Sequence, residues 1–171
     1  SIIASISLDH MEYLGDTLGK IAYEKGGIIK SDSPTVLLTD NEEIYSVIKD
    51  ICSEKGSKLY HAKNTGANII KQDICGTVFD VENEVVSFKN VNLSLLGEYQ
   101  IISATEVLMA FKAMKDNGMV ISDDTIKEGI AKAKWNGRME IVENNPMVIL
   151  DGAHNIDGIS MLFKSLKKYF S

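Results

Sequence analysis

Two loops of the sequence carry side chains that could bind a ligand or react with one. Asp9 and His10 follow an apolar run, Ile2–Ile6, and the loop Asp151–Asn155 (DGAHN) follows a second apolar run, Met147–Leu150. In open α/β sheets, ligands bind beyond the carboxyl ends of the strands. Both loops would lie at such an end, although aspartate and asparagine are also common in turns that bind nothing.

Lys25 is a third candidate because it lies among apolar side chains. It follows Leu18, Ile21 and Ala22 at helical spacing, so the four side chains would share one face of a helix. Burial lowers the pKa of a lysine, and a neutral amine can add CO2 to form a carbamate, an oxygen anion of the kind that Mg²⁺ binds. The alternative is a lysine whose charged end extends to solvent, paired with Glu12 or Asp16.

The spacing of apolar residues predicts an α/β fold for the first part of the chain. Short apolar runs predict buried strands at 2–6, 34–38 and 58–61. Helical periodicity predicts one helix over 17–25 with Asp16 as its N-cap, and a second from the N-cap Asn41 to Gly56. Strands and helices that alternate in this way form parallel sheets with right-handed crossovers.

The pattern changes beyond residue 76. Residues 77–95 alternate between apolar and polar types, which predicts a small antiparallel meander with breaks at 82–83 and 89–90. The remaining pattern predicts three helices: one over 99–115, one that begins after an N-cap at Ser122, and one over 156–169. It also predicts a turn at 136–137, a linker at 144–146 and a buried strand at 147–150.

The composition is that of an ordinary globular protein. A net charge of −6 argues against nonspecific binding to nucleic acid or to an anionic membrane. The two cysteines, Cys52 and Cys75, form no CxxC pair, which favours a reducing cytoplasm. No apolar run approaches the ~20 residues that a membrane-spanning helix needs. We therefore expect a cytoplasmic protein.

Three stretches resemble the folylpolyglutamate synthases and bifunctional dihydrofolate synthases, whose wider relatives are the Mur ligases. Ser7–Lys30 (SLDHMEYLGDTLGKIAYEKGGIIK) is similar to part of the family's ATPase domain, and Leu95–Phe111 (LLGEYQIISATEVLMAF) is similar to a later segment. Lys134–Gly158 (KWNGRMEIVENNPMVILDGAHNIDG) resembles the junction between the family's two domains. Three motifs in the family's order are far more specific than any one of them.

The resemblance implies that two residues bind magnesium and act in catalysis. His10 matches the family's magnesium-ligating histidine. Lys25, fifteen positions later, matches a lysine that is carbamylated in this superfamily and helps to hold a second Mg²⁺.

The resemblance also implies an ATP site at the domain junction. Arg138 matches an arginine that reaches the ATP phosphates, and Asp151 matches an aspartate on the nucleotide side of the second domain. His154 lies in the same motif, and Gln100 lies in the segment associated with the base. Ser103 departs from the family's asparagine, and a hydroxyl cannot offer adenine the paired donor and acceptor of an amide.

The implied protein is an ATP-dependent ligase that adds glutamate to folate through an acyl phosphate. Its fold would be α/β, with residues 1–143 as the C-terminal part of an ATPase domain built on a partial parallel sheet. Residues 144–171 would supply the first strand and helix of a ligase domain. Its partners would be ATP, Mg²⁺, L-glutamate and folate or dihydropteroate.

One expected motif is absent from the sequence. No phosphate loop of the G-x-x-x-x-G-K-[ST] type occurs, and the chain begins at Ser1 in an expected strand. We therefore expect a central fragment that is inactive alone. The alternatives are a Mur-type muropeptide ligase and a noncatalytic α/β module that has lost its site, which Ser103 favours.

Overall fold

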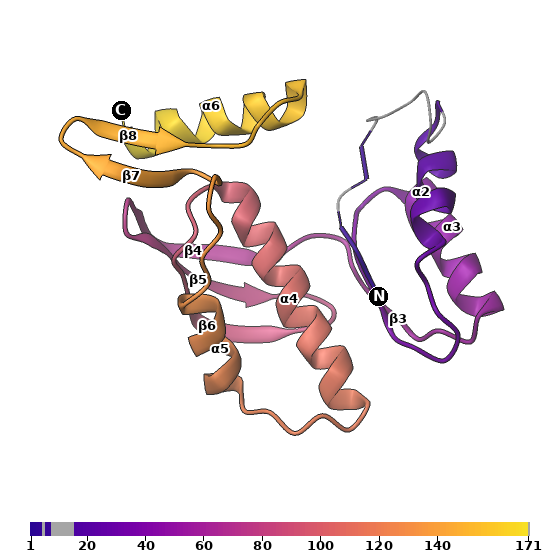
Figure 1. Cartoon of the computed structure of the whole chain (residues 1–171). Helices are drawn as coiled ribbons and strands as arrows, with labels where there is room; N and C mark the ends of the chain where they lie inside the picture. Colours follow the sequence, from indigo (N-terminus) through magenta and orange to yellow (C-terminus); the bar gives the residue numbers. More distant parts are fainter. Residues whose placement is uncertain (5, 8–15, 171) are drawn as a thin grey trace. The chain divides into compact units, whose positions relative to one another are not determined.

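The computed structural model describes residues 1–4, 6–7 and 16–170, except for the side chain of Asp157 (Figure 1). The chain divides into two compact units. Unit 1 comprises Ser1–Gly66, Glu82–Ser87 and Thr105–Val120, and unit 2 comprises Ala67–Val81, Phe88–Ala104 and Ile121–Ser171.

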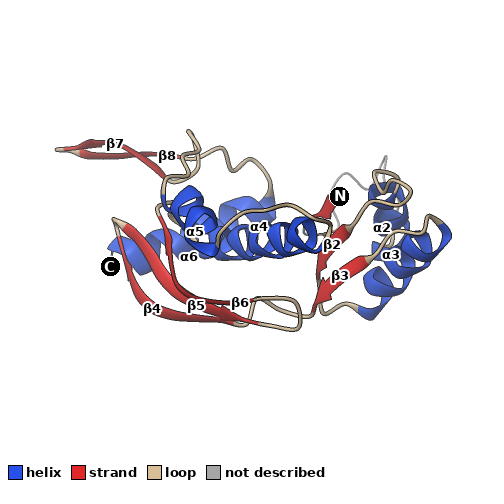
Figure 2. Cartoon of the chain, turned by 90° about the horizontal axis from the view of Figure 1, so that it is seen from below, coloured by secondary structure: helices blue, strands red, loops and turns tan. Residues whose placement is uncertain are grey.

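Unit 1 contains the expected parallel sheet. Its strands β1 (Ile2–Ile3), β2 (Thr35–Leu38) and β3 (Leu59–Ala62) lie in the order β1-β2-β3. Val36 pairs with Ile2 on one side and with Tyr60 on the other. Helices α2 (Leu18–Gly26) and α3 (Glu42–Glu54) lie on the same face of this sheet (Figures 1 and 2), as right-handed crossovers require. The core between them includes Ile3, Ala22, Leu37 and Ile48.

The helix N-caps of unit 1 were predicted with one error. Asn41 caps α3 as expected, since its side chain accepts a hydrogen bond from the Ile44 N–H at 3.1 Å. The N-cap of α2 is Thr17 and not Asp16, because the Thr17 hydroxyl lies within 3.2 Å of the Lys20 N–H. Asp16 instead pairs with the Lys20 ammonium at 2.8 Å on the exposed side of the helix.

The antiparallel sheet has three strands, one of which the sequence did not predict. Its strands are β4 (Ala67–Asp73), β5 (Gly76–Glu82) and β6 (Ser87–Leu93), in the order β4-β5-β6 (Figure 2). β4 was not predicted because a register shift between Ile69 and Lys71 interrupts its alternation. The break expected at 89–90 is not one, since β6 continues through both residues, and the Asn90 N–H donates to Asp80 at 2.8 Å.

The next helices lie close to where periodicity placed them. α4 spans Glu98–Asp116, and Ile101 and Leu108 on its inward face are buried. α5 spans Asp123–Ala131 after the expected N-cap Ser122, whose hydroxyl accepts from the Thr125 N–H. Within the described part of the chain, no helix is both long and apolar enough to cross a membrane.

The segment expected to be a linker is the turn of a β-hairpin. β7 (Glu140–Asn144) and β8 (Met147–Leu150) pair antiparallel around a cis Asn145–Pro146 peptide bond, and α6 (Ile156–Phe170) follows. β8 is not buried as predicted, since 50% of Leu150 is exposed. Among the described strands, β8 pairs only with β7, so the apolar run stays at the surface.

Candidate functional site

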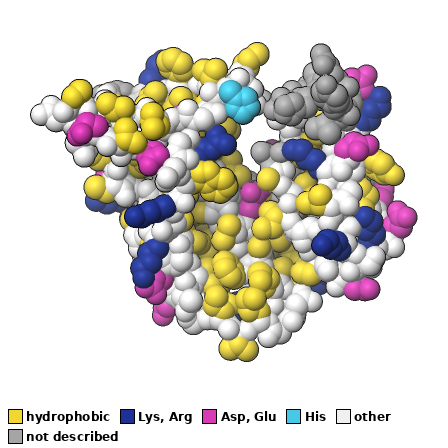
Figure 3. Space-filling view, in the orientation of Figure 1, with side chains coloured by type: hydrophobic (Ala, Val, Ile, Leu, Met, Phe, Trp, Pro, Cys, Tyr) yellow, Lys and Arg dark blue, Asp and Glu magenta, His cyan; other side chains and the backbone are white. Residues whose placement is uncertain are grey.

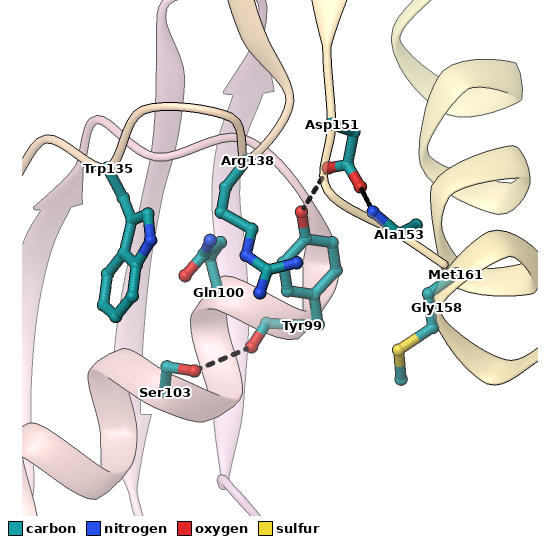
Figure 4. Close-up of a pocket in the computed structure, with 9 residues that line it drawn as sticks. All are labelled: Tyr99, Gln100, Ser103, Trp135, Arg138, Asp151, Ala153, Gly158 and Met161. Carbon is teal, nitrogen blue, oxygen red and sulfur yellow. Dashed lines mark hydrogen bonds between the residues drawn. The ribbon is translucent and has the colours of Figure 1, made fainter. Parts of the chain in front are cut away.

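Three segments of unit 2 line a pocket of about 300 Å³ (Figure 4). The first turns of α4, the loop before β7 and the stretch from the end of β8 into α6 each contribute side chains. The lining residues are Tyr99, Gln100, Ser103, Trp135, Arg138, Asp151, Ala153, Gly158 and Met161.

Asp151 connects the three segments by hydrogen bonds. One carboxylate oxygen, Oδ2, accepts from the Met139 N–H at 2.9 Å and from the Tyr99 hydroxyl at 3.4 Å. The other oxygen, Oδ1, accepts from the Ala153 N–H at 2.7 Å. A carboxylate that receives several such bonds fixes the loop that carries it.

Tyr99 acts as a hydrogen-bond donor in this network. Burial and the negative charge of Asp151 raise the pKa of the Tyr99 phenol to about 12, because both disfavour the phenolate. The phenol therefore keeps its proton at neutral pH and donates a hydrogen bond to Asp151.

Arg138 is placed at the pocket by a tight turn. Gly137 and Met139 on either side of it have φ values of 71° and 44°. A methionine in this region is strained, and its N–H bond to Asp151 helps to hold it there. Gly152 passes close by: its N–H donates to the Gly137 carbonyl at 2.8 Å, and a Cβ on it would lie 3.6 Å from Arg138 Nη1.

The first turns of α4 supply two further polar side chains near Arg138, those of Gln100 and Ser103. Gln100 is buried, while Ser103 is exposed and lines the pocket. The Ser103 hydroxyl donates to the Tyr99 carbonyl one turn earlier, at 3.5 Å.

The pocket brings together three of the residues that the resemblance assigns to ATP, namely Gln100, Arg138 and Asp151. His154 is not among the lining residues: its ring is exposed, with Nδ1 3.0 Å from the Gly152 carbonyl oxygen. What each residue does stays a prediction.

The two predicted magnesium ligands belong to the other end of the chain. Lys25 lies on α2 in unit 1, where it is half-buried beside the fully buried Ile21 and Ala22. His10, like Asp9, lies outside the described residues. Among those that the structure describes, no group of three or more His, Cys, Asp and Glu side chains could hold a metal ion. The magnesium site therefore stays a prediction.

Three lining side chains, Trp135, Tyr99 and Met161, were assigned no role from the sequence. Trp135 lies three positions before Arg138 in the junction motif, and Tyr99 immediately precedes Gln100. Both lie within the motifs that resemble the family, and this position could have marked Trp135 and Tyr99 as candidate site residues. Met161 had no such signal, because a methionine in an amphipathic helix normally belongs to a core.

Comparison with known proteins gives consistent matches. The chain is 33% identical to the dihydrofolate synthase/folylpolyglutamate synthase of Bacillus subtilis, over 100% of this chain and 40% of that protein. The folylpolyglutamate synthase of Thermotoga maritima has a similar structure, with a TM-score of 0.80 and 32% identity over 99% of this chain and 38% of that one. A solved FPGS–AMPPCP–folate complex matches with a TM-score of 0.82 and 28% identity over 97% of this chain and 41% of that one.

These matches cover only part of each relative. The chain spans about 40% of the length of the curated relatives it matches most clearly. No protein-family model matches it.

Proposed function

This chain belongs to the folylpolyglutamate synthase/dihydrofolate synthase family, and from that premise we propose that it is part of an ATP-dependent ligase that adds glutamate to folate. The observation that carries the proposal is the pocket of unit 2, where Gln100, Arg138 and Asp151 converge from three segments. A solved relative that holds both AMPPCP and folate supports the assignment of a nucleotide and a folate as substrates.

The side chains of the pocket suit a nucleotide. Arg138 is the only arginine of the chain, and a guanidinium binds phosphate oxygens through two parallel hydrogen bonds. Asp151 would not bind the phosphates, since its oxygens already accept bonds from Met139, Ala153 and Tyr99. We assign to Asp151 the task of holding the Arg138 loop in place.

The proposed reaction has two steps. The γ-phosphoryl group of ATP is transferred to a carboxylate of the folate substrate, and the amine of glutamate then displaces phosphate from the acyl phosphate. Arg138 would offset the charge that develops on the transferred group, and the fixed pocket would position it. Magnesium would assist when bound, with His10 and the carbamate of Lys25 as its proposed ligands.

We propose further that this chain supplies the nucleotide end of the ligase and does not form the amide alone. Residues 1–143 would belong to the ATPase domain and 144–171 to the ligase domain, as the motif order implies. Since the chain covers about 40% of its relatives' length, other parts of the ligase would bring the remaining groups.

Binding of AMPPCP tests the proposal directly. We expect calorimetry to detect binding to the 171-residue chain, and Arg138→Gln to weaken it at least about tenfold, because a charge-assisted bond to phosphate is lost. Lys164→Gln is the matched control: it removes one exposed positive charge from α6 of the same unit, outside the pocket lining, and should leave the affinity unchanged. Absence of binding, or equal affinity in Arg138→Gln, would contradict the proposal.

Dihydrofolate synthesis is the second candidate function. The B. subtilis relative carries the names of both activities, and both use the same ligation chemistry. Product analysis of the intact ligase, offered dihydropteroate or a folate with glutamate and ATP, distinguishes the two.

A further inference from the structure

We propose that the unit 2 pocket holds the nucleotide base by stacking on Trp135 and discriminates only weakly between adenine and guanine. The inference rests on the proposed nucleotide-binding function and adds how the base is held and which bases are accepted.

Trp135 presents a large flat surface at the wall of the pocket. Its side chain is 65% exposed and lines the pocket together with Ser103 and Arg138. An exposed indole is unusual because so much apolar surface stays in water. Bases stack on such rings whatever their hydrogen-bonding edges, since every base has a π-face.

The charges indicate which end of the nucleotide lies at Trp135. In Figure 4, Trp135 and Asp151 lie on opposite sides of Arg138, and Ser103 lies below, towards Trp135. A phosphate must avoid the Asp151 carboxylate and contact the Arg138 guanidinium. The base is then directed away from Asp151, towards the indole ring.

The polar groups near Trp135 offer little means of telling purines apart. The Ser103 hydroxyl already donates to the Tyr99 carbonyl, at 3.5 Å. Gln100 is only 7% exposed, and its amide interacts with the Tyr99 hydroxyl. A buried amide engaged in this way reads neither the 6-amino group of adenine nor the 6-oxo group of guanine.

The fluorescence of Trp135 provides the test, because it is the only tryptophan of the chain. We expect ADP and GDP both to quench this fluorescence on titration into the 171-residue chain, with affinities within about threefold of each other. Inorganic pyrophosphate should displace both nucleotides and cause no quenching itself, because it lacks a ring.

Three outcomes separate this inference from the proposed function. If neither nucleotide binds by calorimetry, the proposed function fails and this inference fails with it. If ADP binds without quenching, or binds more than about tenfold better than GDP, base stacking without discrimination is wrong while the nucleotide site stands.

Variants measured by calorimetry give a second readout. Trp135→Leu should lower the affinity for ADP and GDP alike, by about tenfold, whereas Trp135→Phe keeps an aromatic face and should retain most of it. Ser103→Asn adds an amide beside the base and should raise the preference for ADP over GDP several-fold, since an amide can pair with adenine. A Trp135→Leu variant that binds like the wild type, or a Ser103→Asn variant with an unchanged preference, would overturn the inference.

Discussion

Glu106 is a buried carboxyl group in a helix and carries no assigned role. Its side chain is 6% exposed, and its Oε1 atom has no hydrogen-bond partner among the described residues. Burial raises the pKa of Glu106 to about 7, because the charged form loses its contact with water. A raised carboxyl pKa has a direct consequence for stability.

We predict that Glu106 makes the protein less stable as pH rises from about 4.5 to about 7. The unfolded chain releases the proton of this carboxyl near 4.5 and the folded chain near 7, so the folded state binds more protons in this window. The free energy of unfolding should therefore fall across it, by at most about 3 kcal/mol. Urea unfolding at a series of pH values measures the effect.

Glu106→Gln provides the control for that prediction. Glutamine has nearly the same shape and does not titrate, so the variant should lose this part of the pH dependence and gain relative stability at neutral pH. Parallel stability curves for the wild type and the variant would contradict the assignment.

At the candidate site, residue types were easier to predict than their arrangement. The resemblance assigns Gln100, Arg138 and Asp151 to the nucleotide, and all three line one pocket. The orientation of His154 could not be read from the sequence in this way, because it depends on the local path of the loop, where Nδ1 faces the Gly152 carbonyl. Nor does the sequence show that Trp135 is exposed, since burial depends on packing.

At the scale of the elements, α6 is anchored by its last turn. The Tyr169 hydroxyl accepts hydrogen bonds from Gln72 Nε2 in β4, at 2.7 Å, and from the Gly97 N–H, at 3.3 Å. Lys168 pairs with Glu98 nearby. These contacts attach the helix to the antiparallel sheet and to the start of α4.

We predict that Tyr169→Phe weakens this anchor. The change removes the acceptor of two hydrogen bonds and leaves the partly buried amide of Gln72, whose Oε1 already lacks a partner in the described structure, with fewer bonds. The free energy of unfolding should fall by about 1–2 kcal/mol. Hydrogen exchange should also show faster exchange of the α6 backbone amides.

Tyr23→Phe is the matched control for the anchor. Tyr23 is 65% exposed on α2, so loss of its hydroxyl should change stability by less than about 0.5 kcal/mol. Equal unfolding midpoints for the two variants would mean that the Tyr169 contacts do not stabilise the helix.

Elements were predicted well where one local signal governs them. Helices α3 and α5 begin after the expected caps because Asn41 and Ser122 bond to backbone amides three residues later. Strand β4 was not predicted because its register shift interrupts the two-residue alternation of apolar and polar side chains. The sequence could not show that strand β8 is exposed. Its apolar residues favour a buried strand, but they do not determine which other elements pack against it.

At the scale of the whole molecule, one region leaves much apolar surface in water. β8 and α6 expose several large hydrophobic side chains, and hydrophobic side chains gather at the surface over the β7–β8 hairpin (Figure 3). The most exposed are Leu150, Ile156 and Phe163, at 50%, 87% and 60%. Exposed apolar groups that gather in this way favour association.

We predict that the 171-residue chain self-associates through this surface. Phe163→Lys should lower the sedimentation coefficient at high protein concentration and reduce the binding of a hydrophobic dye. Val120→Lys is the control, since Val120 is 99% exposed in the loop between α4 and α5 and the change introduces the same charge. If Phe163→Lys sediments like the wild type, or both variants dissociate equally, this surface is not the cause.

The family of the molecule was predictable because three separate motifs occur in one order along a single chain. Composition alone would have given only an acidic globular protein. The fold class followed from the alternation of strands and helices in unit 1, and the parallel order β1-β2-β3 confirms it. The roles of His10 and Lys25 stay predictions, since the resemblance alone proposes their magnesium site.

Helix α6 contacts the pocket and its surroundings at both of its ends. Gly158 and Met161 near its start line the pocket, while Tyr169 in its last turn holds Gly97, two residues before Tyr99. If a bound ligand contacts Gly158 or Met161, its affinity and the attachment of α6 would be coupled, and each would change the other by the same factor. With such coupling, a tag or fused domain that displaces the last turn of α6 would weaken ligand binding near the start of the helix, and a bound ligand would strengthen the Tyr169 contacts.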